Sequence, residues 1–347
     1  MSDYTVVYFN GIERGFSIPS TLAHFSVGSM EFTIKWYGVL IALGYLVALI
    51  AATHLAKRAK IDVDKLYDAI IFGTLGAIVG ARAYYIIFNL DYYLANPASI
   101  IRIDEGGLAI YGGVIGALLA GFITCRVRKL KVLDAFDLAA VGFLAGQGIG
   151  RWGNFTNQEA FGTNTSLPWG MMSEKTTEYL VEHQDFMTAH GMTVDPYMGV
   201  HPTFLYESLW CFIGFILLYF MFKKHRKFRG QIALSYGVWY GAERAFVEGL
   251  RTDSLYIAGT NIRVSQILSL ALAVVCLVIL IVKLIKYKGQ PLLSEREPAE
   301  NEEKSDSDEA SDSKADEKVA LGAAAEEIKV EETGKDEQKN KEEQSRG

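Results

Sequence analysis

Long apolar stretches that contain almost no charge dominate the first 293 residues of the chain. Each is 18 to 23 residues long, which is enough to cross a hydrocarbon core of roughly 30 Å as an α-helix. The expected spans are residues 33–55, 66–88, 107–125, 133–150, 203–222, 231–248 and 264–285. This pattern predicts an all-α polytopic integral membrane protein with about seven transmembrane helices.

Clusters of basic residues alternate with these spans and predict the side on which each loop lies. Lysine and arginine are enriched in short cytoplasmic loops. Every cluster follows an odd-numbered span, which puts the N-terminus outside and the C-terminus in the cytoplasm. Residues 1–32 are mixed and polar, so we expect the first span to direct insertion. The clusters are Lys57, Arg58, Lys60 and Lys65; Arg126, Arg128, Lys129 and Lys131; Lys223, Lys224, Arg226, Lys227 and Arg229; and Lys283, Lys286 and Lys288.

Glycines spaced by four residues lie inside the predicted spans. Gly76 and Gly80, Gly112 and Gly116, and the series Gly142, Gly146 and Gly150 follow this spacing. Small residues at that interval let two helix backbones approach closely in lipid. The segment between the fourth and fifth spans is about 50 residues long, which is too long for a simple turn. We expect it to form a small extracytoplasmic cap of about residues 155–202.

Charge divides the chain into two unlike regions. From Ser294 to the end, acidic residues outnumber basic ones by ten, whereas the first 293 residues carry a net charge of +4, which together give −6. We therefore expect a transmembrane domain over residues 1–292 and a disordered acidic cytoplasmic tail over residues 293–347, with a short helix around residues 319–330. A soluble enzyme and a nucleic-acid binder are both disfavoured. Cys125, Cys211 and Cys276 lie in apolar segments and are interpreted as buried hydrophobes rather than disulfide partners.

Charged residues inside membrane spans are costly and therefore mark candidate sites. With the orientation above, polar side chains from six spans reach the same level, the outer boundary of the membrane. They are Tyr37, Arg82, Tyr111, Arg151, Glu207, Arg244 and Glu248. Only Asp137 lies at the inner end, where a cap or a loop contact accounts for it.

Two sets of polar residues lie close together in the sequence. Tyr240, Arg244, Glu248 and Arg251 fall within an arc of about 80° on one helix. The second group is residues 150–159, GRWGNFTNQE, which contains Arg151, two asparagines and Glu159. Each set also has a purely structural interpretation. The residues on one helix can be an internal Arg–Glu pair at i,i+4, and residues 150–159 can be an anchor at the membrane interface. Two arginine clusters at one depth favour a shared anion site, and the abundant anion at this boundary is a lipid phosphate.

At these residues the chain resembles the bacterial phosphatidylglycerol–prolipoprotein diacylglyceryl transferase family. The resemblance covers nearly the whole body of the chain but not the acidic tail. Residues 150–159 are its most specific part. The other matching stretches are Trp36-Tyr37-Gly38, Gly80-Ala81-Arg82, residues 106–113 (GGLAIYGG), residues 201–207 (HPTFLYE) and residues 240–251.

The resemblance implies transfer of diacylglycerol from phosphatidylglycerol to the lipobox cysteine thiol of a prolipoprotein in the bacterial cell membrane, without a metal or a cofactor. The products are a thioether and glycerol 1-phosphate. By the family pattern Arg151 and Arg244 match its essential arginines, and other functional positions match Asn154, Glu159, Glu207, Tyr37, Tyr240 and Glu248. We expect catalysis from Arg151, Arg244, Tyr111 and Glu159. We expect substrate binding from Tyr37, Arg82, Asn154, Glu207, Tyr240, Glu248 and Arg251. Some members have histidine where this chain has Tyr111, so a histidine base is missing at that position.

The chemistry of the residues agrees with this reading. A thiol with a pKa of about 8.5 is only partly ionised at pH 7, and the positive field of Arg151 and Arg244 favours both the thiolate and the leaving phosphate.

A transporter or carrier of an anionic lipid is the alternative from another class of function. Transporters place their sites near the midplane between repeats, whereas the polar groups here gather at one boundary. An intramembrane protease is a third alternative, and no Gly-x-Ser-x-Gly or His-Glu-x-x-His motif supports it.

Overall fold

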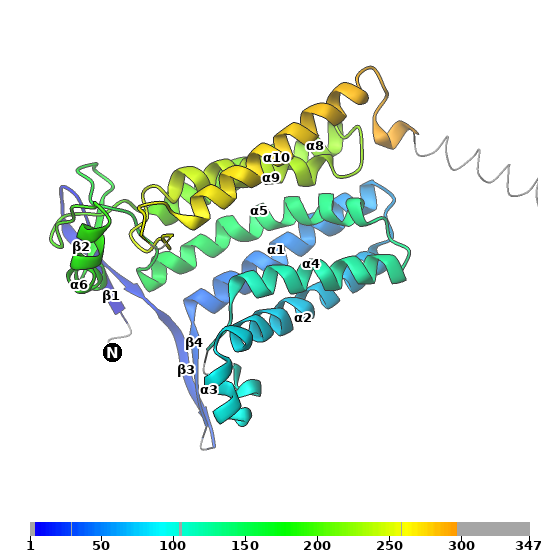
Figure 1. Ribbon diagram of the computed structural model, residues 1–347. Helices are drawn as coiled ribbons and strands as arrows, with labels where there is room; N and C mark the ends of the chain where they lie inside the picture. Colours follow the sequence, from blue (N-terminus) through cyan, green and yellow to red (C-terminus); the bar gives the residue numbers. More distant parts are fainter. Residues whose placement is uncertain (1–3, 29, 104–105, 258, 297–347) are drawn as a thin grey trace, which may run out of the picture. The chain divides into compact units, whose positions relative to one another are not determined.

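The computed structural model describes residues 4–28, 30–103, 106–257 and 259–296 (Figure 1). Met1–Gln290 forms one compact unit and Pro291–Gly347 a second, of which only residues 291–296 are described. The expected disorder of the acidic tail and its short helix lie outside the described residues. The first unit is mostly helical, which confirms the predicted class of fold.

Six helices among the described residues are long and apolar enough to cross a membrane. The sequence predicted about seven, and the difference is α9 (Gln231–Val247), which has only 17 residues, or about 26 Å. The number of spans and the direction of crossing therefore stay predictions. The six are α1 (Trp36–Arg58), α2 (Val63–Phe88), α4 (Ile110–Val127), α5 (Val132–Asn157), α8 (Thr203–Lys224) and α10 (Val264–Lys286).

Helix α5 is the central helix of the bundle. Its apolar window is 56% buried inside the protein, against 11% for α4 and α10, whose remaining surface is free to face lipid. It packs against α1, α8 and α9, while α2 pairs with α4 and α9 with α10 (Figure 1). The sequence predicted that this helix ends near residue 150, but it continues to Asn157. The extra two turns carry Arg151 and Asn154 on a helix instead of a loop.

Glycines bring the paired helices into backbone contact, as predicted. A Cβ on Gly80 or Gly116 would collide with backbone atoms of the facing helix in the α2–α4 pair. Gly142 and Gly146 likewise face α1, where a Cβ on Gly146 would lie 3.3 Å from the carbonyl oxygen of Gly44. Close backbone approach increases van der Waals contact, which holds helices together where lipid removes the hydrophobic driving force.

Asp137 joins α5 to the start of α9 at the end of the bundle predicted to be cytoplasmic. Its carboxylate is fully buried and accepts hydrogen bonds from Arg226 Nε at 2.9 Å and from the backbone N–H groups of Gly230 and Ala233 at 2.8 and 2.9 Å. Arg226 also pairs with Asp134. The predicted loop contact of Asp137 is therefore confirmed, and it fixes the loop between α8 and α9.

The opposite end carries strands that the sequence analysis did not predict. β1 (Tyr4–Phe9) pairs with β2 (Ile12–Pro19) and with β5 (Met171–Ser173), and β3 (Thr21–Val27) pairs with β4 (Met30–Lys35). The β1–β2 hairpin turns at Asn10-Gly11, where Gly11 has a φ of 74°, and Asn-Gly is a strong signal for such a turn. Exposed and buried residues alternate over Tyr4-Thr5-Val6-Val7, and a pattern of four residues is too short to predict a strand.

The segment between α5 and α8 folds into a small unit together with β1. It contains β5, α6 (Glu174–Glu182) and α7 (Gln184–Ala189). Its hydrophobic core joins Val7 of β1 to residues of the cap, namely Phe161, Met171, Leu180, Met187, Val194, Val200 and Phe204. The β1–β2 hairpin therefore packs with the cap, because Val7 of β1 lies in its core.

Asp137→Asn is expected to destabilise the bundle strongly. The amide carries no charge to offset the buried guanidinium of Arg226 and offers one acceptor oxygen instead of two. Breaking such a buried pair costs about 3–5 kcal/mol. Thermal unfolding in detergent should show a midpoint several degrees lower than that of Asp64→Asn, an exposed carboxylate on α2. Equal midpoints for the two variants would mean that Asp137 does not hold the loop.

Candidate active site

The C-terminal end of α5 is shaped by a left-handed turn. Gln158 has a φ of 56° and ends the helix, and the chain then doubles back. Glu159 Oε1 accepts hydrogen bonds from the side-chain amides of Asn154 at 3.0 Å and Asn157 at 3.3 Å. The ring of Tyr37 from α1 lies so near Gly153 that a Cβ there would be 2.6 Å from Tyr37 Cδ2. Three predicted site residues, Tyr37, Asn154 and Glu159, therefore gather at this helix end.

A buried carboxylate connects three helices beside this turn. Glu207 of α8 is 1% exposed and contacts Arg151 Nη1 of α5 at 3.0 Å and Arg244 Nη1 of α9 at 3.4 Å. Arg244 Nη2 continues to Glu248 at 2.6 Å. The two arginine side chains are 21% and 17% exposed, whereas both carboxylates are buried. The two sequence motifs with arginine, 150–159 and 240–251, therefore meet in one ion-paired chain.

The donors of Arg151 are only partly used in this chain. A guanidinium has five N–H groups. Among the described contacts, Arg151 uses only Nη1, and this goes to Glu207. Its Nε and Nη2 groups have no partner among the described contacts. The Arg151 side chain is partly exposed, whereas its partner Glu207 is buried.

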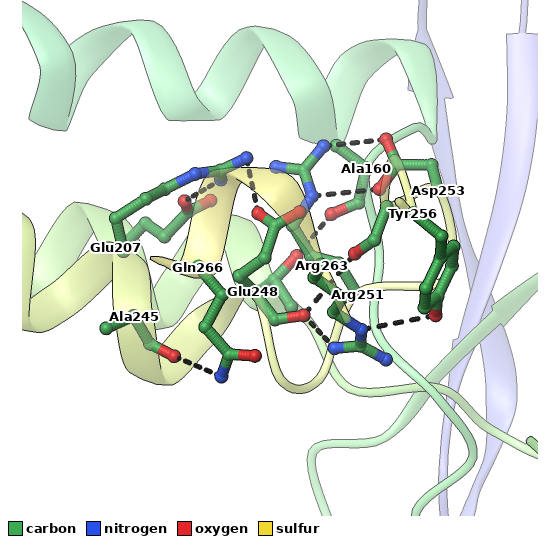
Figure 2. Close-up of polar contacts among 12 residues, drawn as sticks. Ala160, Glu207, Ala245, Glu248, Arg251, Asp253, Tyr256, Arg263 and Gln266 are labelled. Atoms are coloured by element: carbon green, nitrogen blue, oxygen red, sulfur yellow. Dashed lines mark hydrogen bonds and ion pairs between the residues drawn. The ribbon is translucent and has the colours of Figure 1, made fainter. Parts of the chain in front are cut away.

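A second set of contacts fixes the segment that follows α9 (Figure 2). Arg251 binds Asp253 through two hydrogen bonds of 2.8 and 2.7 Å. Burial alone would raise the pKa of Asp253, but the hydrogen bonds and charge of Arg251 hold that pKa below its ordinary value. Arg263 donates to the backbone carbonyl of Glu248 and, through Nε, to the Tyr256 hydroxyl at 3.2 Å. In Figure 2 these groups lie beside Glu207 and Glu248.

Helix α9 presents different faces to its neighbours. Gly237 and Gly241 lie against α10, where a Cβ on Gly241 would be 2.6 Å from the carbonyl oxygen of Ser269. Tyr240 stacks on Tyr236 with ring centroids 5.6 Å apart, and the hydroxyl of Tyr236 accepts a hydrogen bond from Gln147 of α5. The predicted stripe of Tyr240, Arg244, Glu248 and Arg251 therefore borders α5 and α8 rather than lipid alone.

Arg82 is engaged in a different way from the other arginines. All five of its N–H groups donate to backbone carbonyls of the loop between α2 and α4, namely those of Ser99, Ile100, Arg102, Gly106 and Gly107. Its guanidinium also lies 5.1 Å from the ring centroid of Tyr93. The loop includes α3 (Leu90–Ala95) and η1 (Pro97–Ile101) and borders a pocket of about 380 Å³. Arg82 thus holds this loop and has no N–H left for a phosphate.

Tyr111 lies in the first turn of α4, directly after the loop that Arg82 holds. Its side chain is 43% exposed, and no described contact joins Tyr111 or Arg82 to the ion-paired chain of Arg151 and Arg244. Eight of the eleven predicted residues come from α5 and the turn directly after it, from α8, from α9 and from the segment after α9. Tyr37 packs on α5. Within the described part of the chain, no group of three His, Cys, Asp or Glu side chains is placed to hold a metal ion.

Three polar residues of this region were missed in the sequence. Asp253 and Arg263 lie after α9, in a loop where charge is ordinary, and nothing local marked them. Glu243 was detectable, because it is a second acid on α9 directly before Arg244. It is 3% exposed in the structure. A charged residue in a membrane span marks a candidate site, and this rule applied to Glu243 as much as to Arg244.

Comparison with known proteins gives a consistent result. A family model described as "Prolipoprotein diacylglyceryl transferase" matches residues 24–282. A protein of Finegoldia magna named phosphatidylglycerol–prolipoprotein diacylglyceryl transferase is 44% identical over 262 residues, which are 76% of this chain and 94% of that protein. Proteins of the same name from Limosilactobacillus reuteri and Clostridium novyi are each 42% identical, over 75% and 74% of this chain and 90% and 94% of their own lengths.

Arg82→Lys is expected to loosen the loop between α2 and α4. A lysine ammonium has three N–H donors on one atom and cannot reach all five carbonyls. Hydrogen–deuterium exchange of residues 99–107 should become at least tenfold faster. Arg14→Lys, a change at an exposed arginine on β2, should leave this exchange as it is in the parent protein. Unchanged protection in Arg82→Lys would show that the carbonyl contacts do not order the loop.

Proposed function

Because this chain belongs to the prolipoprotein diacylglyceryl transferase family, we propose that it transfers the diacylglyceryl group of phosphatidylglycerol to the lipobox cysteine thiol of prolipoproteins. The products are a thioether-linked lipid on the peptide and glycerol 1-phosphate. The chain is accordingly a multi-pass enzyme of the cell membrane that acts in lipoprotein biosynthesis. The nucleophile belongs to the peptide substrate, so no cysteine of the chain has to react.

The pairing of Arg151 and Arg244 through Glu207 carries the proposal for the site. The two guanidinium groups belong to different helices and share one buried carboxylate, which keeps them close together although their charges repel. A phosphate bound by the remaining donors of Arg151 and by the edge of Arg244 would receive charge-assisted hydrogen bonds from two directions. Charge develops on this phosphate when the bond to the diacylglyceryl carbon breaks, and fixed donors stabilise that charge most.

The remaining predicted residues have supporting roles in this proposal. Glu159, held by Asn154 and Asn157 at the end of α5, would contact the polar head group or the peptide backbone. Tyr37 and Tyr240 would offer their hydroxyl groups to the substrates. Arg251 is bound by Asp253, and its proposed role is to add positive potential. Arg82, whose N–H groups are all used by the loop, would act on the substrates only through that loop. Tyr111 would act through its exposed side chain in the first turn of α4.

The function is tested with purified protein in vesicles of phosphatidylglycerol and a peptide that contains a lipobox cysteine. Mass spectrometry should show a peptide that is heavier by one diacylglyceryl group and the release of glycerol phosphate. Vesicles of phosphatidylethanolamine alone and a peptide with serine in place of the cysteine serve as controls. If the peptide keeps its mass with phosphatidylglycerol, the proposed function is wrong.

Arg151→Lys and Arg244→Lys separate bidentate phosphate binding from positive charge alone. Lysine keeps the charge but loses the planar fork. Each variant should lose about 10²-fold in kcat, the usual effect of removing one fixed donor from a developing charge. Arg14→Lys, a matched exchange at an exposed arginine on β2, should keep the parent rate. Full turnover in both lysine variants would contradict the phosphate contact.

A further inference from the structure

Glu243 is an acidic side chain that the proposed chemistry has not yet used. It lies on α9, is 3% exposed, and neither of its carboxyl oxygens has a hydrogen-bond partner among the described residues. The other buried charged groups of the bundle contrast with it, because Asp137, Glu207 and Arg226 all have close partners. A buried polar atom without a partner requires an explanation, and one explanation is a ligand that supplies the donor.

The position of Glu243 on α9 directs it toward the site. Two residues correspond to a rotation of about 200°, so Glu243 lies nearly opposite Gly241, which packs against α10. Helix α9 contacts α5 and α8 on its other sides. Glu243 is within electrostatic reach of Arg151 of α5, Glu207 of α8 and the adjacent Arg244. Gln147 of α5 also has a buried carbonyl oxygen without a described partner.

Charge in the ion-paired chain is already balanced without Glu243. Arg151 and Arg244 carry two positive charges, and Glu207 and Glu248 carry two negative charges in direct contact with them. A further carboxyl at this place has no cation of its own to pair with. A buried carboxyl without a partner of its own, close to the two arginines, is a suitable carrier of a proton for a bound substrate.

The reaction needs a group of this kind. The thiol of the peptide must lose a proton, and the departing phosphate can gain one. The position where some family members have histidine is Tyr111 here, and a phenol with an ordinary pKa of about 10 is a poor base at pH 7. His201, at the start of α8, faces the Tyr206 hydroxyl at 3.1 Å instead. Burial lowers the pKa of His201 below its ordinary value.

We infer that Glu243 carries the proton between the substrate thiol and the leaving phosphate, an inference that rests on the proposed function. The sulfur forms a bond to the diacylglyceryl carbon, and the bond from that carbon to the phosphate oxygen breaks. The thiol proton passes to the Glu243 carboxyl, and a proton from Glu243 passes to the phosphate. Glycerol phosphate leaves as a monoanion, so atoms and charge balance without a further reactant.

Glu243→Gln tests this inference, because the amide is nearly isosteric and cannot carry the proton. At pH 7 its kcat should fall about 10²-fold or more, the usual contribution of a positioned acid or base, while KM for phosphatidylglycerol stays within threefold. Above pH 9 the thiol, with a pKa of about 8.5, is ionised without help. The defect should then shrink to less than tenfold. Removing a buried carboxyl without partners should not lower the thermal midpoint.

Two controls complete the experiment. Glu182→Gln, an exposed carboxyl on α6, should behave as the parent protein at every pH. Glu243→Asp keeps a titratable group, so it should be more active at pH 7 than Glu243→Gln and should show the pH profile of the parent protein. If Glu243→Gln does not fold, the result of Glu243→Asp decides the question. A defect that is equal at pH 7 and pH 9, or a loss of pH dependence in His201→Gln instead, overturns the inference. An inactive parent protein refutes the proposed function itself.

Discussion

The shared contact of Arg151 and Arg244 with the buried carboxylate of Glu207 joins α5, α8 and α9 at the end of the bundle that carries the candidate site. A charge taken out of water is costly unless it is paired, and removing one partner costs several kcal/mol. Helices α5, α8 and α9 can therefore adopt only a register in which these three groups meet. At the other end the buried Asp137 performs the same task through Arg226 and two backbone N–H groups. Two ionic contacts at opposite ends of α5 thus fix the helices that carry the site, and van der Waals packing fills the space between them.

The partner of each arginine decides what that arginine can still bind. Carbonyls around Arg82 take all five of its N–H groups, so its charge serves the loop between α2 and α4. Glu207 takes only one edge of Arg151, from the buried side. The same residue type is therefore structural in one helix pair and available to a ligand in the other. A sequence shows that both arginines lie in membrane helices, but it does not show how many of their donors are occupied.

This difference explains which predictions from the sequence succeeded. Continuous hydrophobicity located the ends of most helices within a few residues, and glycine spacing indicated which helices pack closely but not against which partner. The convergence of Arg151, Glu207, Arg244 and Glu248 followed from depth in the membrane. The β1–β2–β5 sheet was missed because β5 lies more than 160 residues after β1 and contributes only three residues. The extension of α5 to Asn157 was missed because polar residues there suggested a loop, although they line a site.

The short length of α9 connects the fold to the chemistry. At 17 residues it is about 26 Å long, less than the roughly 30 Å of a hydrocarbon core, and its last turn contains Glu243 and Arg244. In the proposed function, a longer apolar helix would lift these groups into water, where an arginine binds phosphate weakly. The short helix would instead keep them at the boundary where the lipid phosphate meets the glyceryl carbon, with polar head groups on one side and hydrocarbon on the other. The bond between phosphate and the diacylglyceryl group lies at that boundary, so an enzyme with its site there would not have to lift the lipid out of the membrane.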